Sequence, residues 1–133
     1  MIDVLIIDKT DQIKSVLLVP EADVVSCDDE VKALNAVESK PSAVVLLNYD
    51  VMQEQTAEYI KMVLSVSSTS KIVVIADELR EKEILTCLLA GAKGYQQLDS
   101  LKNYVRKLVS VMDAGEAWIT RRMTATLIDA LRR

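Results

Sequence analysis

The amino-acid sequence predicts an α/β fold, with a doubly wound sheet of five parallel strands followed by a C-terminal helical extension. Short apolar runs of strand length alternate with stretches in which apolar residues recur every three or four positions, the spacing of a helix face. The chain has 133 residues and is 50% hydrophobic, which suits one domain with its own core. Strands and helices in alternation are joined by right-handed crossovers, so we expect helices on both faces of a parallel sheet.

The apolar runs are the expected strands. Val4-Leu5-Ile6-Ile7 is continuously apolar, as is typical of a parallel strand that is covered on both faces. The last run, Gly94-Tyr95-Gln96-Gln97, is shorter and less apolar than the others. In chain order, we expect strands at residues 4–7, 22–26, 43–47, 72–76 and 94–97.

Helical spacing fills the segments between and after these strands. From Asp11 onward, Ile13, Val16 and Leu17 share one helix face, and Pro20 closes this first helix. Further apolar stripes predict helices around residues 31–37, 59–66, 84–89, 101–112 and 123–131.

Polar residues and a glycine mark the ends of several helices. Asp28 or Asp29 is expected to cap the second helix, and Thr120 to cap the last segment. Gly91 stands where a helix C-cap is expected. We expect residues 1–117 to form the domain, and residues 118–133 to form a helix or linker towards an output domain outside this chain.

The composition excludes several kinds of chemistry. The chain has no histidine, which removes Ser-His-Asp triads, histidine metal ligands and histidine phosphocarriers. The absence of Phe, the 4% aromatic content and the net charge of −4 argue against nucleic-acid binding by the body of the domain. Cys27 and Cys87 lack the spacing of a zinc site or a disulfide framework, so we expect them to act as small hydrophobic residues. No cofactor is expected.

The sequence also predicts a cytoplasmic protein without a membrane partner. Its longest apolar runs have the length of strands, which is too short to span a bilayer. The N-terminal residues Met1-Ile2-Asp3-Val4 lack the basic start and apolar stretch of a signal peptide.

In a doubly wound sheet, ligands bind beyond the carboxyl ends of the strands. The residues expected at that edge are Asp8, Lys9, Asn48, Tyr49, Ala76 and Asp77. A flavin mononucleotide site would need a loop rich in Gly, Ser and Thr after the first strand. That loop, residues 8–12, has no glycine and carries two carboxylates. No glycine-rich dinucleotide or Walker-type loop occurs either.

Several stretches together resemble the receiver domain of bacterial response regulators. Residues 4–9 are similar to that family's first strand, which ends in an acidic pair, and residues 41–48 to its third strand, which normally ends in the phosphorylated aspartate. Residues 71–76 resemble its fourth strand, and residues 90–99 resemble its Ala-Gly-Ala-x-Gly-Tyr-x-x-Lys stretch. The ending Gly115-Glu116-Ala117-Trp118 is similar to the linker of the NarL/LuxR subclass, where a DNA-binding helix-turn-helix usually follows. The resemblance covers nearly the whole chain and implies a flavodoxin-like, receiver-type fold.

The chain departs from the receiver pattern at four of the five working positions. Asp8 is the one survivor of the acidic pair, because Lys9 stands in second place. Asn48 occupies the phosphoacceptor position, Ala76 the hydroxyl position, and Leu98 the position of the phosphoryl-binding lysine. An amide cannot attack phosphorus as a carboxylate does. The resemblance therefore implies a degenerate phosphorylation site with no catalytic residue.

We expect this site to bind no Mg²⁺, which in receivers is held by carboxylates, backbone oxygen and water. A like charge at about 4 Å costs roughly 1 to 4 kcal/mol, enough to defeat a weak site, and Lys9 is expected to neutralise Asp8 in place of the ion. Asp50 lies two positions beyond the strand end and should point elsewhere. Asp77 could approach Asp8, but two carboxylates without a phosphoacceptor do not make a receiver.

Three features carry alternative interpretations. Tyr95 matches the aromatic whose rotation reports activation in receivers, and it is also interpretable as a half-buried tyrosine of an edge strand. Trp118 is either a dimer anchor or a residue that packs the tail onto the preceding helix. The arginines of the tail form either a solvated helix face or an approach to DNA made by an absent downstream domain: Arg121, Arg122, Arg132 and Arg133.

The favoured function is an atypical pseudo-receiver of a response regulator, a signalling and dimerisation module in transcription control that works without phosphorylation and is not an enzyme. The resemblance implies a homodimer or partner contact through the fourth helix, fifth strand and fifth helix, or through the first and fifth helices, around residues 79–97 and 100–113. It implies DNA contact only through a helix-turn-helix outside this chain. Two alternatives stay open. One is a receiver that catalyses its own aspartyl phosphorylation in a phosphorelay; the other is a module that binds a small ligand in the former phosphorylation pocket, lined by Ala76 and Leu98.

Overall fold

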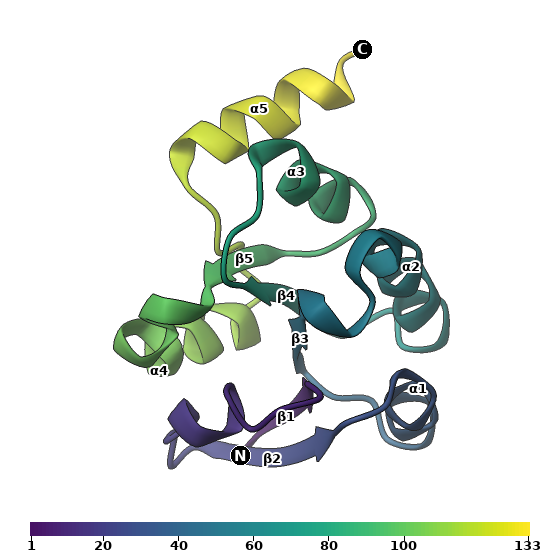
Figure 1. Cartoon of the computed structure of the whole chain (residues 1–133), viewed down its shortest axis with the longest axis vertical. Coiled ribbons are helices and arrows are strands. Elements are labelled where there is room, and N and C mark those ends of the chain that lie inside the picture. Colours follow the sequence, from purple (N-terminus) through teal and green to yellow (C-terminus); the bar gives the residue numbers. More distant parts are fainter.

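A computed structural model describes all 133 residues of the chain. Five strands form one parallel sheet in the order β2-β1-β3-β4-β5, as Figure 1 shows. The strands are β1 (Ile2–Ile7), β2 (Ala22–Cys27), β3 (Val44–Asn48), β4 (Lys71–Ala76) and β5 (Gly94–Gln97). The doubly wound five-stranded sheet predicted from the sequence is confirmed, and all five strands lie where they were expected, with ends that differ by at most two residues.

Five α-helices and four short 3-10 turns connect or follow these strands. The helices are α1 (Glu30–Ser39), α2 (Thr56–Val66), α3 (Glu81–Leu89), α4 (Leu101–Asp113) and α5 (Arg121–Leu131). The 3-10 turns are η1 (Lys14–Val16), η2 (Tyr49–Val51), η3 (Gln53–Gln55) and η4 (Leu98–Ser100). None of the helices is long and apolar enough to cross a membrane.

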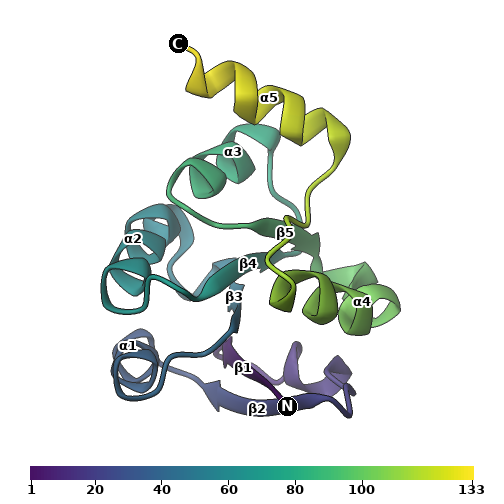
Figure 2. The ribbon, with the colours of Figure 1, turned by 180° about the vertical axis from the view of Figure 1, so that it is seen from behind.

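The two faces of the sheet are covered unequally. Helices α1, α2 and α3 lie on one face, whereas α4 and the segment around η1 lie on the other (Figures 1 and 2). Alternate residues of each central strand enter the two cores: Leu5 and Ile7 pack towards α1–α3, and Val4 and Ile6 pack towards α4. All four side chains are at most 1% exposed, which is why these strands are apolar without interruption.

The helix expected over residues 11–20 is not formed, and this prediction was wrong. Only η1 (Lys14–Val16) forms, and the chain then runs on to β2 without a helix. The buried residues of the segment are Ile13, Leu17 and Val19. Val19 lies two positions after Leu17, so the two cannot share a helix face. The proline that follows Val19 also disfavours a helical backbone there.

Three expected helix ends are confirmed. The carboxylate of Asp29 accepts hydrogen bonds from the backbone N–H groups of Val31 and Lys32, at 2.7 and 3.0 Å, and caps α1. Thr120 Oγ1 accepts from the N–H of Met123 at 3.1 Å and caps α5. Gly91 follows α3 with a φ of +119°, a backbone conformation that favours glycine.

The segment after α4 returns to the edge of the sheet. Trp118 forms a parallel bridge with Gly94 of β5: its carbonyl accepts from Tyr95 N at 3.0 Å, and its own N–H donates to the Lys93 carbonyl at 3.0 Å. Its ring lies 6.3 Å from that of Tyr104 on α4. Trp118 therefore packs the tail onto α4, one of its two expected roles.

Helix α5 then lies against α3, at the end of the molecule in Figure 1. Met123 is buried in the core on the α1–α3 side, and Leu127 packs against the same core. Arg122 forms an ion pair of 3.1 Å with Glu81 of α3. Residues 118–133, expected to be a helix or linker beyond the domain, thus contact both β5 and α3.

Candidate functional site

The carboxyl edge of the sheet brings the expected site residues to neighbouring strand ends. Asp8 directly follows β1, Asn48 ends β3, and Ala76 ends β4. Asn48 pairs in register with Ile75, so Ala76 is one residue further along the same edge. Asp8, Asn48 and Ala76 are 3%, 2% and 5% exposed. Three of the five positions that form the reaction centre of a receiver are thus buried, whereas Lys9 is exposed and Leu98 is partly exposed.

The carboxylate of Asp8 is occupied by hydrogen bonds from within the chain. Oδ1 accepts from the side-chain amide of Asn48 at 3.0 Å, and from both the N–H and the hydroxyl of Thr10 at 3.1 Å. Oδ2 accepts from the backbone N–H of Ile13 at 3.2 Å. Three of these donors lie at Oδ1, and the single hydroxyl hydrogen of Thr10 can instead go to Gln12 Oε1 at 3.2 Å. Oδ2 accepts one bond and keeps one of its two lone-pair sites.

Asn48 uses both ends of its amide. The nitrogen Nδ2 donates to Asp8, and the oxygen Oδ1 accepts from the N–H of Asp50 at 3.0 Å, which caps the η2 turn. An aspartate at this position could accept the same bond from Asp50 but could not donate to Asp8. The side chain that takes the phosphoacceptor position therefore serves as a link between β1 and the loop after β3.

The hypothesis that Lys9 neutralises Asp8 is not supported. Lys9 is exposed, and none of the ion pairs in the structure joins it to Asp8. Backbone hydrogen bonds from Lys32 and Val31 lower the pKa of Asp29, and the positive charges of Lys32 and Lys9 lower it further. The side chain of Asp8 is buried and hydrogen-bonded to Asn48, whereas Lys9 is exposed.

Sequence reasoning missed the two residues that complete the Asp8 network. Thr10 and Ile13 supply three of its four hydrogen bonds. Thr10 carries a signal that could have been recognised, since an Asp followed two residues later by Thr is typical of a turn in which the aspartate accepts from that residue's backbone. Ile13 donates through its backbone, which leaves no trace in the sequence.

These donors do not fit a magnesium ion. Mg²⁺ demands near-octahedral coordination by oxygens, usually one or two carboxylates with several waters. Here Asp8 is the only carboxylate at the buried edge, and the neighbouring amide offers it a hydrogen-bond donor. Asp50 and Asp77 are exposed, and no group of three His, Cys, Asp or Glu side chains is placed to hold a metal ion.

A polar cavity of about 370 Å³ opens beside Asp8, between the loops that follow β1 and β2. Its charged lining consists of three lysines and three aspartates: Lys9, Lys14, Lys32, Asp8, Asp11 and Asp28. The pocket expected from the alternative of small-ligand binding was to be lined by Ala76 and Leu98, and neither residue lines this cavity. Leu98 instead packs against the core beneath α4, because an apolar side chain gains more from burial than from a polar rim.

Tyr95 lies half-buried on β5. Burial raises the pKa of its hydroxyl, and the nearby backbone of Leu79 opposes that rise. The Tyr95 N–H donates to the carbonyl of Trp118. Next to it, Gln96 is buried and its Oε1 accepts from Trp118 Nε1 at 3.0 Å, a contact that the sequence did not reveal.

The two cysteines are placed differently: Cys27 lines the cavity beside Asp8, whereas Cys87 does not. Cys87 is buried in the core under α3, and burial raises the pKa of its thiol to about 11. Cys27, at the end of β2, is partly exposed, and its pKa is raised mainly by burial. Both thiols are therefore protonated at neutral pH, which disfavours a nucleophilic role.

Comparison with solved structures identifies the fold. The receiver domain of RcsB from Salmonella enterica serovar Typhimurium, in its apo form, superposes with a TM-score of 0.82 at 14% identity, over 97% of this chain and 99% of that one. A LuxR-family two-component response regulator from Aurantimonas sp. SI85-9A1 gives 0.79 at 13% identity, over 98% of each chain. The chain has the receiver fold. The signal receiver domain of the putative response regulator NarL from Mycobacterium tuberculosis gives 0.76 at 21% identity, over 86% of this chain and 98% of that one.

Short motifs and the structure indicate the receiver fold of this chain, whereas overall sequence similarity does not. No family model and no curated protein matches the sequence. The resemblance to receivers expected from the motifs is nevertheless confirmed at the level of the fold. Helix α5 packs on α3, so it lies on part of the surface expected over residues 79–97.

Proposed function

We propose that this chain is a pseudo-receiver, a module of an atypical response regulator that works by protein contacts and without aspartyl phosphorylation. The observation that carries the proposal is the 3.0 Å hydrogen bond from Asn48 Nδ2 to Asp8 Oδ1. It joins the phosphoacceptor position to the one remaining carboxylate of the acidic pair. The residues that would react with phosphorus or hold its counterion are thus bonded to each other.

Each step of phosphoryl transfer lacks a group. A carboxylate nucleophile is absent, because position 48 is an amide. The charge that develops on the transferred group is normally stabilised by a metal ion and by cationic or hydrogen-bonding side chains. Here Ala76 and Leu98 replace the hydroxyl and the lysine, and Asp8 alone cannot hold the metal. We therefore infer that the domain is not an enzyme.

A module of this kind can still transmit a signal. A partner that binds one of two conformations better than the other shifts their populations without any covalent change. The surfaces that would serve are residues 79–97 and residues 100–113, through a homodimer or a different protein. Since α5 already lies on α3, the second surface, on α4, is the more accessible of the two.

Transcription control is the setting that the relatives suggest. One solved structure with a TM-score of 0.76 over 92% of this chain is described as a LuxR-family DNA-binding response regulator from Silicibacter pomeroyi, at 19% identity. By analogy, contact with DNA would be made by a helix-turn-helix domain outside this chain, and the protein would be cytoplasmic. The net charge of −4 agrees with a receiver part that does not itself bind DNA.

Intact mass after incubation with a small phosphoryl donor tests the proposal. The chain is incubated with acetyl phosphate and millimolar Mg²⁺, and its mass is compared with that of an untreated sample. We expect no added phosphoryl group. A variant with Lys9→Asp, Asn48→Asp, Ala76→Thr and Leu98→Lys, which restores all four missing groups, serves as the matched comparison. A stable phosphoryl adduct on the unaltered chain would contradict the proposal and favour a phosphorelay receiver.

A further inference from the structure

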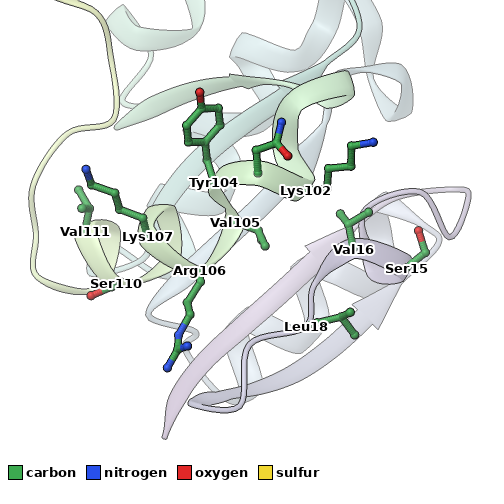
Figure 3. A pocket seen from close by; sticks show the side chains of 11 residues that line it. Ser15, Val16, Leu18, Lys102, Tyr104, Val105, Arg106, Lys107, Ser110 and Val111 are labelled. Carbon is green, nitrogen blue, oxygen red and sulfur yellow. The ribbon is translucent and has the colours of Figure 1, made fainter.

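A cavity of about 540 Å³ lies at the β5 edge of the sheet, between that strand, α4 and the segment after α4. The chain has one Trp, four Tyr and no Phe, and three of these five aromatic side chains line the cavity: Tyr95, Tyr104 and Trp118. Figure 3 shows Tyr104 and Lys107 on the side of α4 that is turned away from η1. A hollow of this size, with aromatic walls and a few polar groups, is typical of a site for a small molecule.

The indole wall of the cavity is held in place by hydrogen bonds. Trp118 Nε1 donates to Gln96 Oε1 at 3.0 Å, and Gln96 Nε2 donates to Ser100 Oγ at 2.8 Å. Gln96 is 8% exposed, so a buried amide fixes the orientation of the indole. The ring of Tyr104 lies 6.3 Å from that of Trp118, at an angle of 55°. A wall that is ordered before binding reduces the entropy that a ligand must offset.

The cavity carries a single positive charge. Lys107 is the only charged residue that lines it. Lys107 is exposed and takes part in none of the ion pairs of the structure. Its neighbours on the surface of α4, three and four positions away, include no acidic residue: Asn103, Tyr104, Ser110 and Val111. The Lys107 ammonium is therefore available to pair with an anionic group of a ligand.

We propose that this cavity binds a small planar aromatic carboxylate. The aromatic ring of the ligand would pack against Tyr104 and Trp118, because aromatic rings attract one another in offset or edge-to-face contacts. Its carboxylate would pair with Lys107. The side chain of Ile119, which also lines the cavity, would add apolar surface beside the ring.

Other classes of ligand fit the cavity less well. Aromatic faces also attract cations, but the charge of Lys107 would repel a cationic ligand. A nucleotide carries more negative charge than one lysine balances, and no glycine-rich loop is present to bind its phosphates. An aliphatic acid could pair with Lys107, but it would gain no aromatic contact.

The cavity also borders the segment that leads into α5. Ile119 and Thr120 line it, and Thr120 caps α5. A bound ligand would therefore favour the arrangement in which this segment lies along β5.

Binding here does not depend on the proposed function, because none of the residues of the degenerate phosphorylation site lines the cavity. A phosphoryl adduct on the unaltered chain would overturn the proposed function and leave the cavity intact. A cavity that binds no aromatic acid would leave the mass measurement unaffected.

The test is a titration of the ¹⁵N-labelled chain with millimolar trans-cinnamate. The chain has one tryptophan, so a single indole N–H signal reports the wall of the cavity. We expect saturable shifts of this signal and of the backbone amides of residues 95–97 and 117–120. Cinnamamide, which lacks the charge, and cyclohexanepropanoate, which lacks the aromatic ring, should each bind at least about threefold more weakly.

Two variants at exposed positions of α4 separate charge from aromatic contact. Lys107→Gln and Tyr104→Leu should each lower the affinity for cinnamate about threefold or more, with otherwise unchanged spectra. Lys102→Gln, on the same helix but outside the cavity, should bind as the unaltered chain does.

The proposal is overturned if cinnamate leaves the indole signal in place, or if its shifts map to the cavity beside Asp8. It is also overturned if cinnamamide or cyclohexanepropanoate binds as tightly as cinnamate, or if Lys107→Gln and Lys102→Gln have equal affinities.

Discussion

Asn48 Nδ2 lies 3.0 Å from Asp8 Oδ1, in a hydrogen bond that connects the ends of two adjacent strands. Both side chains are almost fully buried. A buried hydrogen bond to a charged group contributes about 1.5 to 3 kcal/mol, so this contact stabilises the edge of the sheet where receivers carry out chemistry. Several consequences of the structure can be measured.

Replacing Asn48 should reveal how much of this edge is structural. Asn48→Ala removes the donor to Asp8, and we expect the free energy of unfolding to fall by about 1 to 3 kcal/mol. For Asn48→Asp we expect the free energy of unfolding to fall by about 1 to 4 kcal/mol more than for Asn48→Ala, because two carboxylates then face each other. Urea unfolding of both variants at neutral pH measures the difference in free energy of unfolding. This difference should narrow in acid as one carboxylate is protonated.

Asn48→Asp alone should take up no phosphoryl group, because Lys9, Ala76 and Leu98 remain. Efficient labelling of this single variant would show that those three residues matter little.

Gly94→Ala should displace the segment after α4. A Cβ at position 94 would lie 2.8 Å from both the Cβ and the carbonyl oxygen of Trp118, and the backbone of that residue cannot move without breaking its hydrogen bonds to Lys93 and Tyr95. The chain has one tryptophan, so its fluorescence reports this site alone. We expect a red-shifted emission in the variant; emission identical to that of the unaltered chain would mean that the tail is not held at the edge of β5.

The packing of α5 on α3 should depend on Met123 rather than on the ion pair at its rim. Met123 is buried, and its replacement by Ala is expected to cost about 2 to 5 kcal/mol if the site does not relax. The Arg122–Glu81 pair is exposed, and such pairs contribute about 1 kcal/mol or less. Limited trypsin digestion at Arg121 and Arg122 should therefore be faster in Met123→Ala and nearly unchanged in Glu81→Ala. Faster digestion of Glu81→Ala than of Met123→Ala would show that the ion pair, and not Met123, holds α5 on α3.

The alkaline stability of the protein should carry a contribution from Cys87. Its pKa is raised by burial from 9.0 to about 11, so the unfolded chain loses this proton before the folded one does. The Cys87 thiol therefore has no effect on the pH dependence of the free energy of unfolding below pH about 9, and it lowers this free energy as the pH rises towards about 11. Urea unfolding across this range should show that the free energy of unfolding declines less steeply with pH for Cys87→Ala than for the unaltered chain. The constant loss of stability from removing the side chain does not affect this slope. Equal slopes would contradict the raised pKa. Cys27→Ala, at a more exposed thiol, is the matched control.

Hydrophobic patterning predicted the strands well because short continuous apolar runs are typical of parallel strands that are buried on both faces. The runs at 44–48 and 71–76 are buried on both faces, which is the environment that such runs require. The same reasoning failed at residues 11–20. Ile13, Val16 and Leu17 have helical spacing, but the segment forms a single turn followed by non-helical backbone. Val19 is buried two positions after Leu17, a spacing that one helix face cannot provide.

The site was only partly readable from the sequence. The motifs placed Asp8, Asn48, Ala76 and Leu98 at strand ends, which the structure bears out, since these positions follow or end β1, β3, β4 and β5. What each side chain touches could not be read. Lys9 was expected on Asp8 but is exposed and forms no ion pair with it, and one donor to Asp8 is the backbone N–H of Ile13, which no sequence pattern identifies.

Magnesium titration of the ¹⁵N-labelled chain examines the strand-end site without any phosphoryl donor. Because the Asp8 carboxylate is held by Asn48, Thr10 and Ile13, the amide signals of residues 8–13 and 48–50 should stay in place as Mg²⁺ rises to millimolar concentration. Saturable shifts confined to those signals, absent in an Asp8→Asn variant, would show a working cation site and contradict the pseudo-receiver.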